Sequence, residues 1–339
     1  MDGLERHGEL VGRLGRNAMG RRACRWLLCW LCCLSQGPVM AASPHYAAAG
    51  PYRVQVALEV WHDAVRQRDI PVKRYGPEGL ARVPVILFSH GLGGSREAGE
   101  AWLRHWAAHG YLGIALQHTG SDGALLQGGP MAIRRALKAA MTPEQSRARI
   151  ADVQFVLDEL ARRQGEPGWN QADLAHIGLA GHSFGAVTTQ AMAGEQLSVG
   201  APVEEPRLAA FLALSPSARG GENLLNARFS RLQRPFFSIT GSRDDGIGLQ
   251  DIDAANRTLP YRHMPPGDKY LLVLEGGAHM HFAGQHTLRQ QAPPRLEQAV
   301  QAASLAFWEV TLKGRIEART WLRQSFPATL IPGDRWEFK

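Results

Sequence analysis

Short apolar runs typical of buried strands alternate with helix-like segments along most of the chain. The predicted strands cover residues 83–89, 111–116, 176–180, 208–214, 235–240 and 270–274. The predicted helices cover residues 97–109, 142–165 and 294–312. Such alternation is typical of a mainly parallel sheet covered by helices. The chain is therefore expected to be an α/β protein, with residues 52–61 adding antiparallel edge strands.

The composition fits one globular domain. The chain has 339 residues, of which 45% are apolar and 20% charged, and these values exclude a disordered chain. No internal repeat or low-complexity linker follows residue 43, so residues 43–339 are expected to form a single domain. No apolar run reaches the ~18 residues that a membrane span needs. The net charge of +7 includes six arginines among the first 42 residues, and the mildly basic remainder gives no argument for nucleic-acid binding.

The first 42 residues have the pattern of a signal peptide. Arginines at 21, 22 and 25 precede an apolar stretch over 26–34, and Ala41 and Ala42 offer small residues for cleavage. Residues 1–42 are therefore predicted to be a signal peptide, with Met19 as an alternative start, and the protein to be secreted or periplasmic. The alternative is a buried or interfacial helix. All four cysteines lie in this segment, so the rest of the chain can form neither a disulfide nor a cysteine-based metal site.

Residues 181–185 read Gly-His-Ser-Phe-Gly and fit the G-x-S-x-G pattern of a nucleophile elbow. They follow a predicted strand and precede residues 186–190, which can begin a helix. A sharp strand-to-helix turn would hold Ser183 in a strained conformation, and flanking glycines lack the Cβ atoms that would collide there. The helix N-terminus favours negative charge that develops beside it. The pattern predicts Ser183 as a nucleophile, and the alternative is a tight turn with a chance serine.

Five motifs together resemble those of a known superfamily. They are residues 88–95 (Phe-Ser-His-Gly-Leu-Gly-Gly-Ser), 110–111 (Gly-Tyr), 181–185, 265–270 (Pro-Pro-Gly-Asp-Lys-Tyr) and 277–280 (Gly-Ala-His-Met). In these motifs the chain resembles α/β-hydrolases, and more narrowly bacterial predicted dienelactone hydrolases and platelet-activating-factor-acetylhydrolase-like serine esterases. The resemblance covers about residues 50–312. It implies the α/β-hydrolase fold, with a mainly parallel central sheet flanked by helices in one domain, a Ser-His-Asp triad and no cofactor.

A glycine-rich loop follows the first predicted strand. Acyl transfer places negative charge on the carbonyl oxygen, which backbone N–H groups stabilise. The family pattern implies the N–H groups of Leu92 and Phe184 as this oxyanion hole. A dinucleotide- or phosphate-binding loop is the alternative, but Arg96 stands where its third glycine is needed. His90 and His182 are expected to order these loops through local hydrogen bonds, and His118 to be structural or exposed.

The acid and base of an α/β-hydrolase triad follow the serine in the chain, acid first. The acid is expected after the fifth predicted strand, where the family's spacing implies Asp244, with Asp245 as the alternative. The base is expected after the sixth, where the family pattern implies His279, with His281 as the alternative. A metal site made of His279, His281 and His286 is a further alternative, although no H-E-x-x-H pattern accompanies these residues.

These residues together predict a serine hydrolase that cleaves carboxylic esters through an acyl-enzyme. The side chains expected around the substrate are Leu92, Phe184, Met280 and Phe282, which are mostly apolar. They suit a small-molecule, lipid or polyester ester. The alternatives are a non-catalytic hydrolase-like binding protein and a cofactor-free haloperoxidase-like activity on the same triad. Residues 313–339 are expected to pack onto the domain as irregular structure or a short helix.

Overall fold

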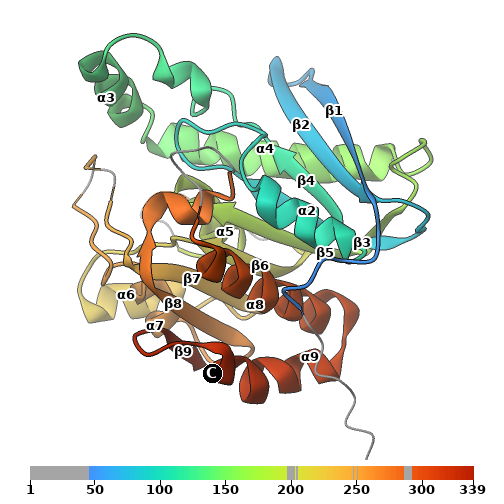
Figure 1. The fold of residues 1–339 in the computed structure, drawn as a ribbon. Coiled ribbons are helices and arrows are strands. Elements are labelled where there is room, and N and C mark those ends of the chain that lie inside the picture. Colours follow the sequence, from blue (N-terminus) through green and yellow to red (C-terminus); the bar gives the residue numbers. More distant parts are fainter. Residues whose placement is uncertain (1–45, 197–202, 204, 247, 250, 286–291) are drawn as a thin grey trace, which may run out of the picture. The chain divides into compact units, whose positions relative to one another are not determined.

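A single sheet of nine strands organises the part of the chain that the structure describes (Figure 1). This computed structural model describes residues 46–196, 203, 205–246, 248, 249, 251–285 and 292–339. The predicted signal peptide lies outside these residues. The strands are β1 (Val54–Asp63), β2 (Arg68–Pro77), β3 (Val83–Ser89), β4 (Leu112–Leu116), β5 (Ala172–His182), β6 (Leu208–Leu214), β7 (Phe236–Arg243), β8 (Lys269–Ala278) and β9 (Arg335–Phe338).

The sheet is parallel in its centre and antiparallel at both edges. The strand order is β1-β2-β4-β3-β5-β6-β7-β8-β9. Strands from β4 to β8 in this order pair in parallel, whereas β2 pairs antiparallel with both β1 and β4, and β9 pairs antiparallel with β8. Parallel strands end at one edge of a sheet, where ligands of α/β proteins bind. The loops after β3, β5, β6, β7 and β8 therefore meet at that edge.

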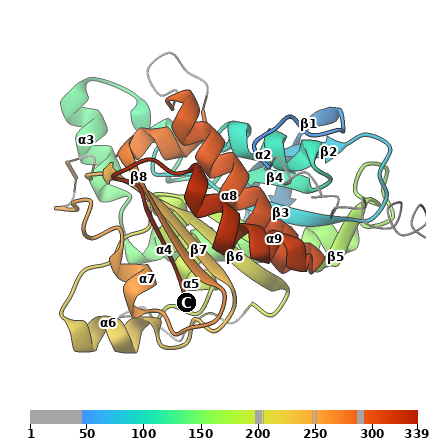
Figure 2. The ribbon, with the colours of Figure 1, turned by 60° about the horizontal axis from the view of Figure 1, so that its bottom comes forward.

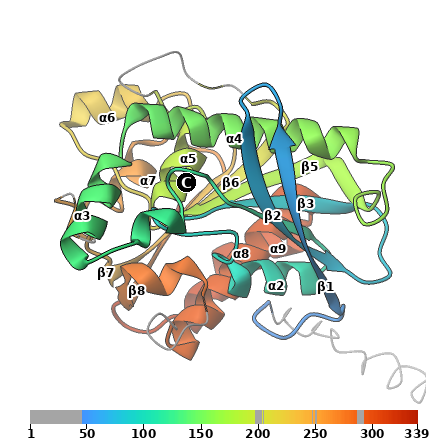
Figure 3. The same ribbon diagram turned by 90° about the horizontal axis from the view of Figure 1, so that it is seen from above.

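Helices cover both faces of the sheet. They are α2 (Glu100–Ala108), α3 (Pro130–Ala139), α4 (Pro143–Arg162), α5 (Phe184–Met192), α6 (Glu222–Phe229), α7 (Leu259–His263), α8 (Pro294–Lys313) and α9 (Ile316–Thr320). Short turns of other helix types are η1 (Gly123–Leu126), η2 (His279–Ala283), η3 (Trp321–Ser325) and η4 (Phe326–Thr329). Figure 3 shows α4 and α6 on one side of the sheet and α2 and α8 on the other, and Figure 2 shows α8 lying across the strands. This is the α/β-hydrolase fold, as predicted.

The central strands are apolar throughout because both of their faces are covered. Every residue of β3 is buried. Val85 and Leu87 belong to the core on the α4 side, and Ile86 and Phe88 to the core on the α2 and α8 side. Side chains of successive strand residues point to opposite faces, so a strand between two helical layers needs a continuous apolar run. This is the reason why the sequence shows such runs instead of strict alternation.

Aromatic side chains join the helices α2 and α8. The rings of Trp106 and Trp308 meet edge to face with centroids 5.8 Å apart. The Trp106 Nε1–H group donates to Ser304 Oγ at 2.9 Å, so the buried indole is also satisfied as a donor. Both tryptophans are buried completely or almost so. The two helices therefore cover their face of the sheet as one packed layer.

The structure differs from the sequence predictions mainly at the edges. The predicted edge strands at 52–61 are present as β1, but their partner β2 was not predicted. Residues 313–339 contain short helices, as expected, but they end in a strand, β9, which extends the sheet beside β8. Trp336 of β9 stacks on Tyr270 with centroids 5.6 Å apart. A strand as short as β9 is stabilised by its pairing with β8, which is distant in the sequence. Its own residues therefore carry little information that predicts a strand.

We predict that Trp106→Ala lowers the free energy of unfolding by about 3–5 kcal/mol, because it leaves a cavity between α2 and α8. Urea denaturation measures this change. Leu58→Ala is the control, because Leu58 is 56% exposed on β1, and it should change the free energy of unfolding by less than about 0.5 kcal/mol. Equal losses in the two variants would contradict this view of the α2–α8 layer.

Candidate active site

The predicted nucleophile elbow forms a tight turn between β5 and α5. Ser183 lies between the two elements with φ 56° and ψ −112°, a conformation that non-glycine residues rarely adopt. A Cβ atom at position 185 would lie 1.8 Å from the Ser89 carbonyl oxygen, and one at position 181 would lie 2.3 Å from the Gly185 oxygen. Only glycine fits at either position. The strained serine is held in place because the chain passes this closely on both sides.

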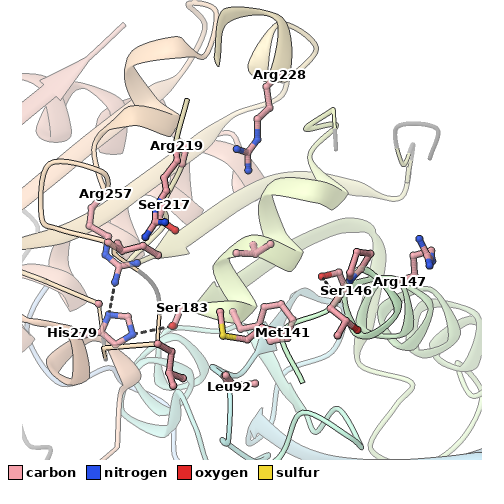
Figure 4. Close-up of a pocket in the computed structure, with 18 residues that line it drawn as sticks. Leu92, Met141, Ser146, Arg147, Ser183, Ser217, Arg219, Arg228, Arg257 and His279 are labelled. Carbon is pink, nitrogen blue, oxygen red and sulfur yellow. Dashed lines mark hydrogen bonds between the residues drawn. The ribbon is translucent and has the colours of Figure 1, made fainter. Parts of the chain in front are cut away.

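The structure brings together the three residues predicted as a triad. The His279 Nε2 atom lies 2.9 Å from Ser183 Oγ, and its Nδ1 atom lies 2.7 Å from Asp244 Oδ1. Figure 4 shows the imidazole of His279 directed at the serine hydroxyl. The serine follows β5, Asp244 follows β7 and His279 follows β8. Residues distant in sequence therefore meet because parallel strands end at the same edge of the sheet.

The Asp244 carboxylate is buried but well supplied with donors. Thr240 Oγ1 donates to Asp244 Oδ2 at 2.8 Å, and the Arg257 Nε group lies 3.2 Å from Oδ1. Burial by itself would raise the pKa of Asp244, but the hydrogen bond from His279 and the charge of Arg257 outweigh it and lower the pKa. An ionised carboxylate accepts from Nδ1–H, which leaves Nε2 free to accept the serine proton.

Arg257 is a site residue that the sequence predictions missed. Its side chain is buried and also donates to the Ser215 carbonyl at 2.9 Å and to the Asp244 carbonyl at 3.0 Å. Its Nη2 group lies 3.0 Å from His279 Nδ1. Arginine only donates, so His279 Nδ1 cannot both accept from Nη2 and donate to Asp244; the shorter 2.7 Å contact with the ionised carboxylate assigns the Nδ1 hydrogen to Asp244. Arg257 belongs to no recognisable motif. It lies in a stretch to which the sequence patterns assign neither a strand nor a helix.

The alternative acid and base take other roles. The Asp245 side chain is exposed, and its Oδ1 atom accepts from the Ala254 amide at 3.2 Å. The His281 Nδ1 atom accepts from the Ala278 amide at 3.1 Å. Neither contact reaches Ser183, so the geometry favours Asp244 and His279. The described residues contain no cluster of three histidine, cysteine or acidic residues that could hold a metal, and His286 lies outside them.

The predicted oxyanion-hole residues stand beside the serine. Leu92, Ser183 and Phe184 line the same pocket. Within the described residues, the amides of Leu92 and Phe184 donate to no acceptor. Gly185 contacts the end of β3 so closely that the loop bearing Leu92 and the first turn of α5 lie against each other. Two free amides next to a nucleophile can stabilise a developing oxyanion.

Two histidines order these loops, as predicted. The His182 Nε2–H group donates to the His279 carbonyl at 3.0 Å, which fixes the backbone of the candidate base. The His90 Nδ1–H group donates to the Gly91 carbonyl at 2.6 Å, while Nε2 accepts from the His118 amide at 2.9 Å. Burial and then the charge of Arg149 keep the pKa of His90 well below its usual value. These imidazoles therefore act as neutral hydrogen-bonding groups.

A buried arginine connects both arms of the predicted oxyanion hole. Arg149 of α4 donates to the carbonyl of His90, two residues before Leu92, and to Ser121 Oγ at 2.8 Å. Its Nε group donates to Thr188 Oγ1 of α5 at 3.0 Å, and the guanidinium lies 4.7 Å from the centroid of the Phe184 ring. Burial lowers the pKa of Arg149 to about 9, so it remains a cation at neutral pH. It thereby positions the glycine-rich loop relative to α5.

Below this loop lies a second serine–histidine–aspartate set, which the sequence did not reveal. Ser89 Oγ lies 2.9 Å from His118 Nε2, and His118 Nδ1 lies 3.0 Å from Asp152 Oδ2. All three side chains are completely buried, and Arg149 donates to Ser89 Oγ at 2.9 Å. Burial and then the charge of Arg149 lower the pKa of His118 to about 4. No substrate can reach this serine, so the set supports the loop instead of acting on a ligand.

A pocket of about 490 Å³ opens beside Ser183 (Figure 4). Its apolar lining consists of Leu92, Met141, Pro143, Phe184, Val187, Ala218, Leu249 and Ile252. Leu92 and Phe184 were predicted here, but Met280 and Phe282 do not line it, which corrects that prediction. The turn η2 directs Phe282 into the core, where its carbonyl accepts from Trp102 Nε1 at 3.1 Å.

A comparison with known protein families found a match to part of the chain. Residues 55–126 match the family model of platelet-activating factor acetylhydrolase, isoform II. The matched stretch runs from β1 to η1 and contains the glycine-rich loop but none of Ser183, Asp244 and His279. It confirms the resemblance to these α/β-hydrolase-type serine esterases and supports a hydrolase that acts on esters. A comparison with curated proteins gave no match.

We predict that Arg149→Met lowers kcat for a para-nitrophenyl ester by about 10- to 100-fold with little change in KM, because oxyanion donors act mainly on the transition state. Arg149→Lys keeps the cation and should restore part of kcat. Titration with a fluorophosphonate corrects for any loss of folded protein. An unchanged kcat per titrated site in Arg149→Met would contradict the positioning role.

We also predict that His118 stays neutral in the folded protein until the pH approaches 4. Its folded pKa lies below the 6.5 of an exposed imidazole, so the unfolded chain binds its proton first as the pH falls. The contribution of His118 to stability is therefore complete above pH 6.5 and is lost progressively toward pH 4. Imidazole NMR resonances measured against pH test this, and a His118 midpoint near 6.5 would contradict it.

Proposed function

We propose that the protein is a serine hydrolase that cleaves carboxylic esters through an acyl-enzyme. One observation carries the proposal: the hydrogen-bonded chain from Ser183 Oγ to His279 Nε2 at 2.9 Å, and from His279 Nδ1 to Asp244 Oδ1 at 2.7 Å. A serine next to a base that is itself oriented by a carboxylate is the arrangement of an activated nucleophile. The match to an esterase family supports the same reaction class.

The first half of the reaction forms the acyl-enzyme. His279 Nε2 takes the proton of Ser183 Oγ as this oxygen attacks the ester carbonyl carbon. The carbonyl oxygen becomes an oxyanion, which the amides of Leu92 and Phe184 stabilise. His279 then passes its proton to the leaving alcohol oxygen, and the bond between this oxygen and the carbonyl carbon breaks. The acyl group remains on Ser183.

The second half releases the acid. His279 takes a proton from a water molecule, whose oxygen attacks the acyl carbon. The proton then passes from His279 to Ser183 Oγ, and the carboxylic acid leaves. During both halves the buried, ionised Asp244 stabilises the imidazolium that forms on His279. Arg257 limits the cost of burying that carboxylate.

The pocket favours esters with an apolar acyl or alcohol part. Leu92, Met141 and Val187 form part of its wall, and apolar lining of this kind stabilises a hydrocarbon segment by removing it from water. A lipid or polyester ester is the alternative substrate within the same mechanism. The other candidate function is that of a hydrolase-like protein that only binds its ligand. Covalent labelling of the serine distinguishes an enzyme from such a binding protein.

We predict that a fluorophosphonate labels the wild-type protein on Ser183 and that Ser183→Ala abolishes labelling. Ser183→Ala and His279→Ala should lower kcat on a para-nitrophenyl ester by about 10⁴-fold or more, and Asp244→Asn should cause a large loss by disfavouring the Nδ1–H tautomer. Asp245→Asn is the matched control, because its carboxylate is exposed and contacts neither partner. Full turnover in either alanine variant would refute the mechanism, and absence of labelling in the wild type would favour a binding protein.

A further inference from the structure

The two edges of the nine-stranded sheet differ in how they are protected. At one edge, β9 has only four residues, and two of them are the charged Arg335 and Glu337. At the other edge, β1 has ten residues, none of which is proline, lysine or arginine, and it pairs residue for residue with β2. Short length, basic residues, proline and bulges commonly keep an edge strand from pairing with another chain. Figures 1 and 3 show β1 on the outer side of β2, where it is open to such pairing.

The backbone of β1 presents free hydrogen-bonding groups along this edge. Residues of an antiparallel pair alternate between positions that bond to each other and positions that do not. The Pro71 carbonyl accepts from the Gln117 amide at 2.9 Å, so it points toward β4, and its partner Val60 occupies a position that does not bond to β2. The alternation then directs the N–H and C=O groups of Val56, Leu58 and Val60 away from β2. No described strand pairs with them.

The same three residues expose apolar side chains. Val56 is 38% exposed, Leu58 is 56% exposed and Val60 is 57% exposed. Alternate residues of a strand share a face, so these side chains form one row on one face of β1. A row of exposed apolar side chains beside free backbone groups is the surface that an added β-strand covers.

This row is symmetric, which favours a second copy of the same chain as the partner. A two-fold axis through Leu58 places the Leu58 residues of two copies opposite each other, and Val56 of each copy opposite Val60 of the other. Residues whose N–H and C=O groups point outward then face residues of the same kind, as hydrogen-bonded antiparallel pairs require. A contact in which both copies offer the same patch is the commonest arrangement of a homodimer.

The charged residues of β1 are compatible with this pairing. In the same register Glu59 faces Ala57 of the second copy, so the two copies of Glu59 do not meet. The exposed Arg53, just before β1, falls opposite Asp63, which is itself paired with Arg66 within its own chain. No two like charges are therefore opposite each other, which would destabilise the paired strands.

We propose that two copies of this chain associate through β1, which joins their sheets into one continuous sheet with Leu58 at the two-fold axis. The association is independent of the proposed hydrolase function, because β1 contributes no residue to the pocket beside Ser183. The contact involves a single strand of each copy, so we expect it to be weak, with a dissociation constant of about 1–100 μM. Below this concentration single copies unfold, and the contact does not enter the free energy of unfolding of Leu58→Ala.

Sedimentation velocity over a series of protein concentrations tests the association. The wild type should change from monomer to dimer as the concentration rises. Leu58→Glu should weaken the association by about tenfold or more, because two carboxylates then meet at the axis. Within each copy this glutamate lies opposite Lys73 of β2, so the variant is expected to fold, which circular dichroism verifies.

Ile316→Glu is the matched control. Ile316 is 58% exposed on α9, so the substitution removes an equally exposed apolar side chain and adds the same charge away from β1. This variant should dimerise as the wild type does. A wild type that remains monomeric at about 500 μM overturns the proposal, and so does a folded Leu58→Glu variant that dimerises as well as the wild type.

A mixing experiment tests the position of the axis. Leu58→Lys should be monomeric by itself, but an equimolar mixture with Leu58→Glu should form a heterodimer, because opposite charges then meet at the axis. Lys73 is already paired with Glu97 and Glu100, so a further cation beside it is tolerated. Absence of a heterodimer when both variants are folded overturns the placement of Leu58 at the axis.

Hydrogen exchange tests the backbone pairing and needs only the wild type. The amides of Val56, Leu58 and Val60 should exchange several-fold more slowly above the dissociation constant than below it, because pairing protects them. The Glu59 amide is the internal control, since the alternation directs it toward Val72 of β2 at any concentration. Exchange of Val56, Leu58 and Val60 that does not change with concentration overturns the proposal.

Discussion

The close approach of α5 to the end of β3 is the contact on which the candidate site depends. The backbone at Gly185 passes so near the Ser89 carbonyl that no side chain fits between them. This contact holds Ser183 at a positive φ angle and places the Phe184 amide beside the loop that bears Leu92. The candidate nucleophile and the candidate oxyanion donors are therefore positioned by one close contact between two backbone segments.

Buried charge maintains that constraint. The guanidinium of Arg149 joins the glycine-rich loop, the Ser121 segment and α5, and each of its nitrogens has an acceptor. Asp152 is likewise satisfied by Arg68 and His118, and these hydrogen bonds outweigh burial and lower the pKa of Asp152 to about 2. A buried ionic network is stabilising only if all of its members are paired. The same logic applies at Asp244, where Arg257 compensates the carboxylate that orients His279.

Strong local signals predicted much of this molecule. Apolar runs identified β3 and β6 with the observed bounds, and Thr142 and Pro143 mark the start of α4. The G-x-S-x-G pattern predicted Ser183, and the family resemblance implied Asp244 and His279; the structure places these three residues in one hydrogen-bonded chain. The predicted secretion and the signal peptide at residues 1–42 stay predictions. The edge strand β9 and the buried roles of Arg149 and Arg257 had no local signal, because distant contacts alone create them.

The sequence by itself determined the α/β architecture and the identity of a candidate nucleophile, because strand length, helical spacing and a glycine-flanked turn are local properties of the chain. Only the tertiary structure decided which serine faces a pocket and which is sealed beneath it. Ser183 and Ser89 each contact a histidine paired with an aspartate, but Ser89 lies under the loop that covers it. Tertiary packing also turned Phe282 into the core, away from the pocket where the sequence predicted it. Burial and pairing depend on which faces of distant elements meet, and no short stretch of sequence encodes that.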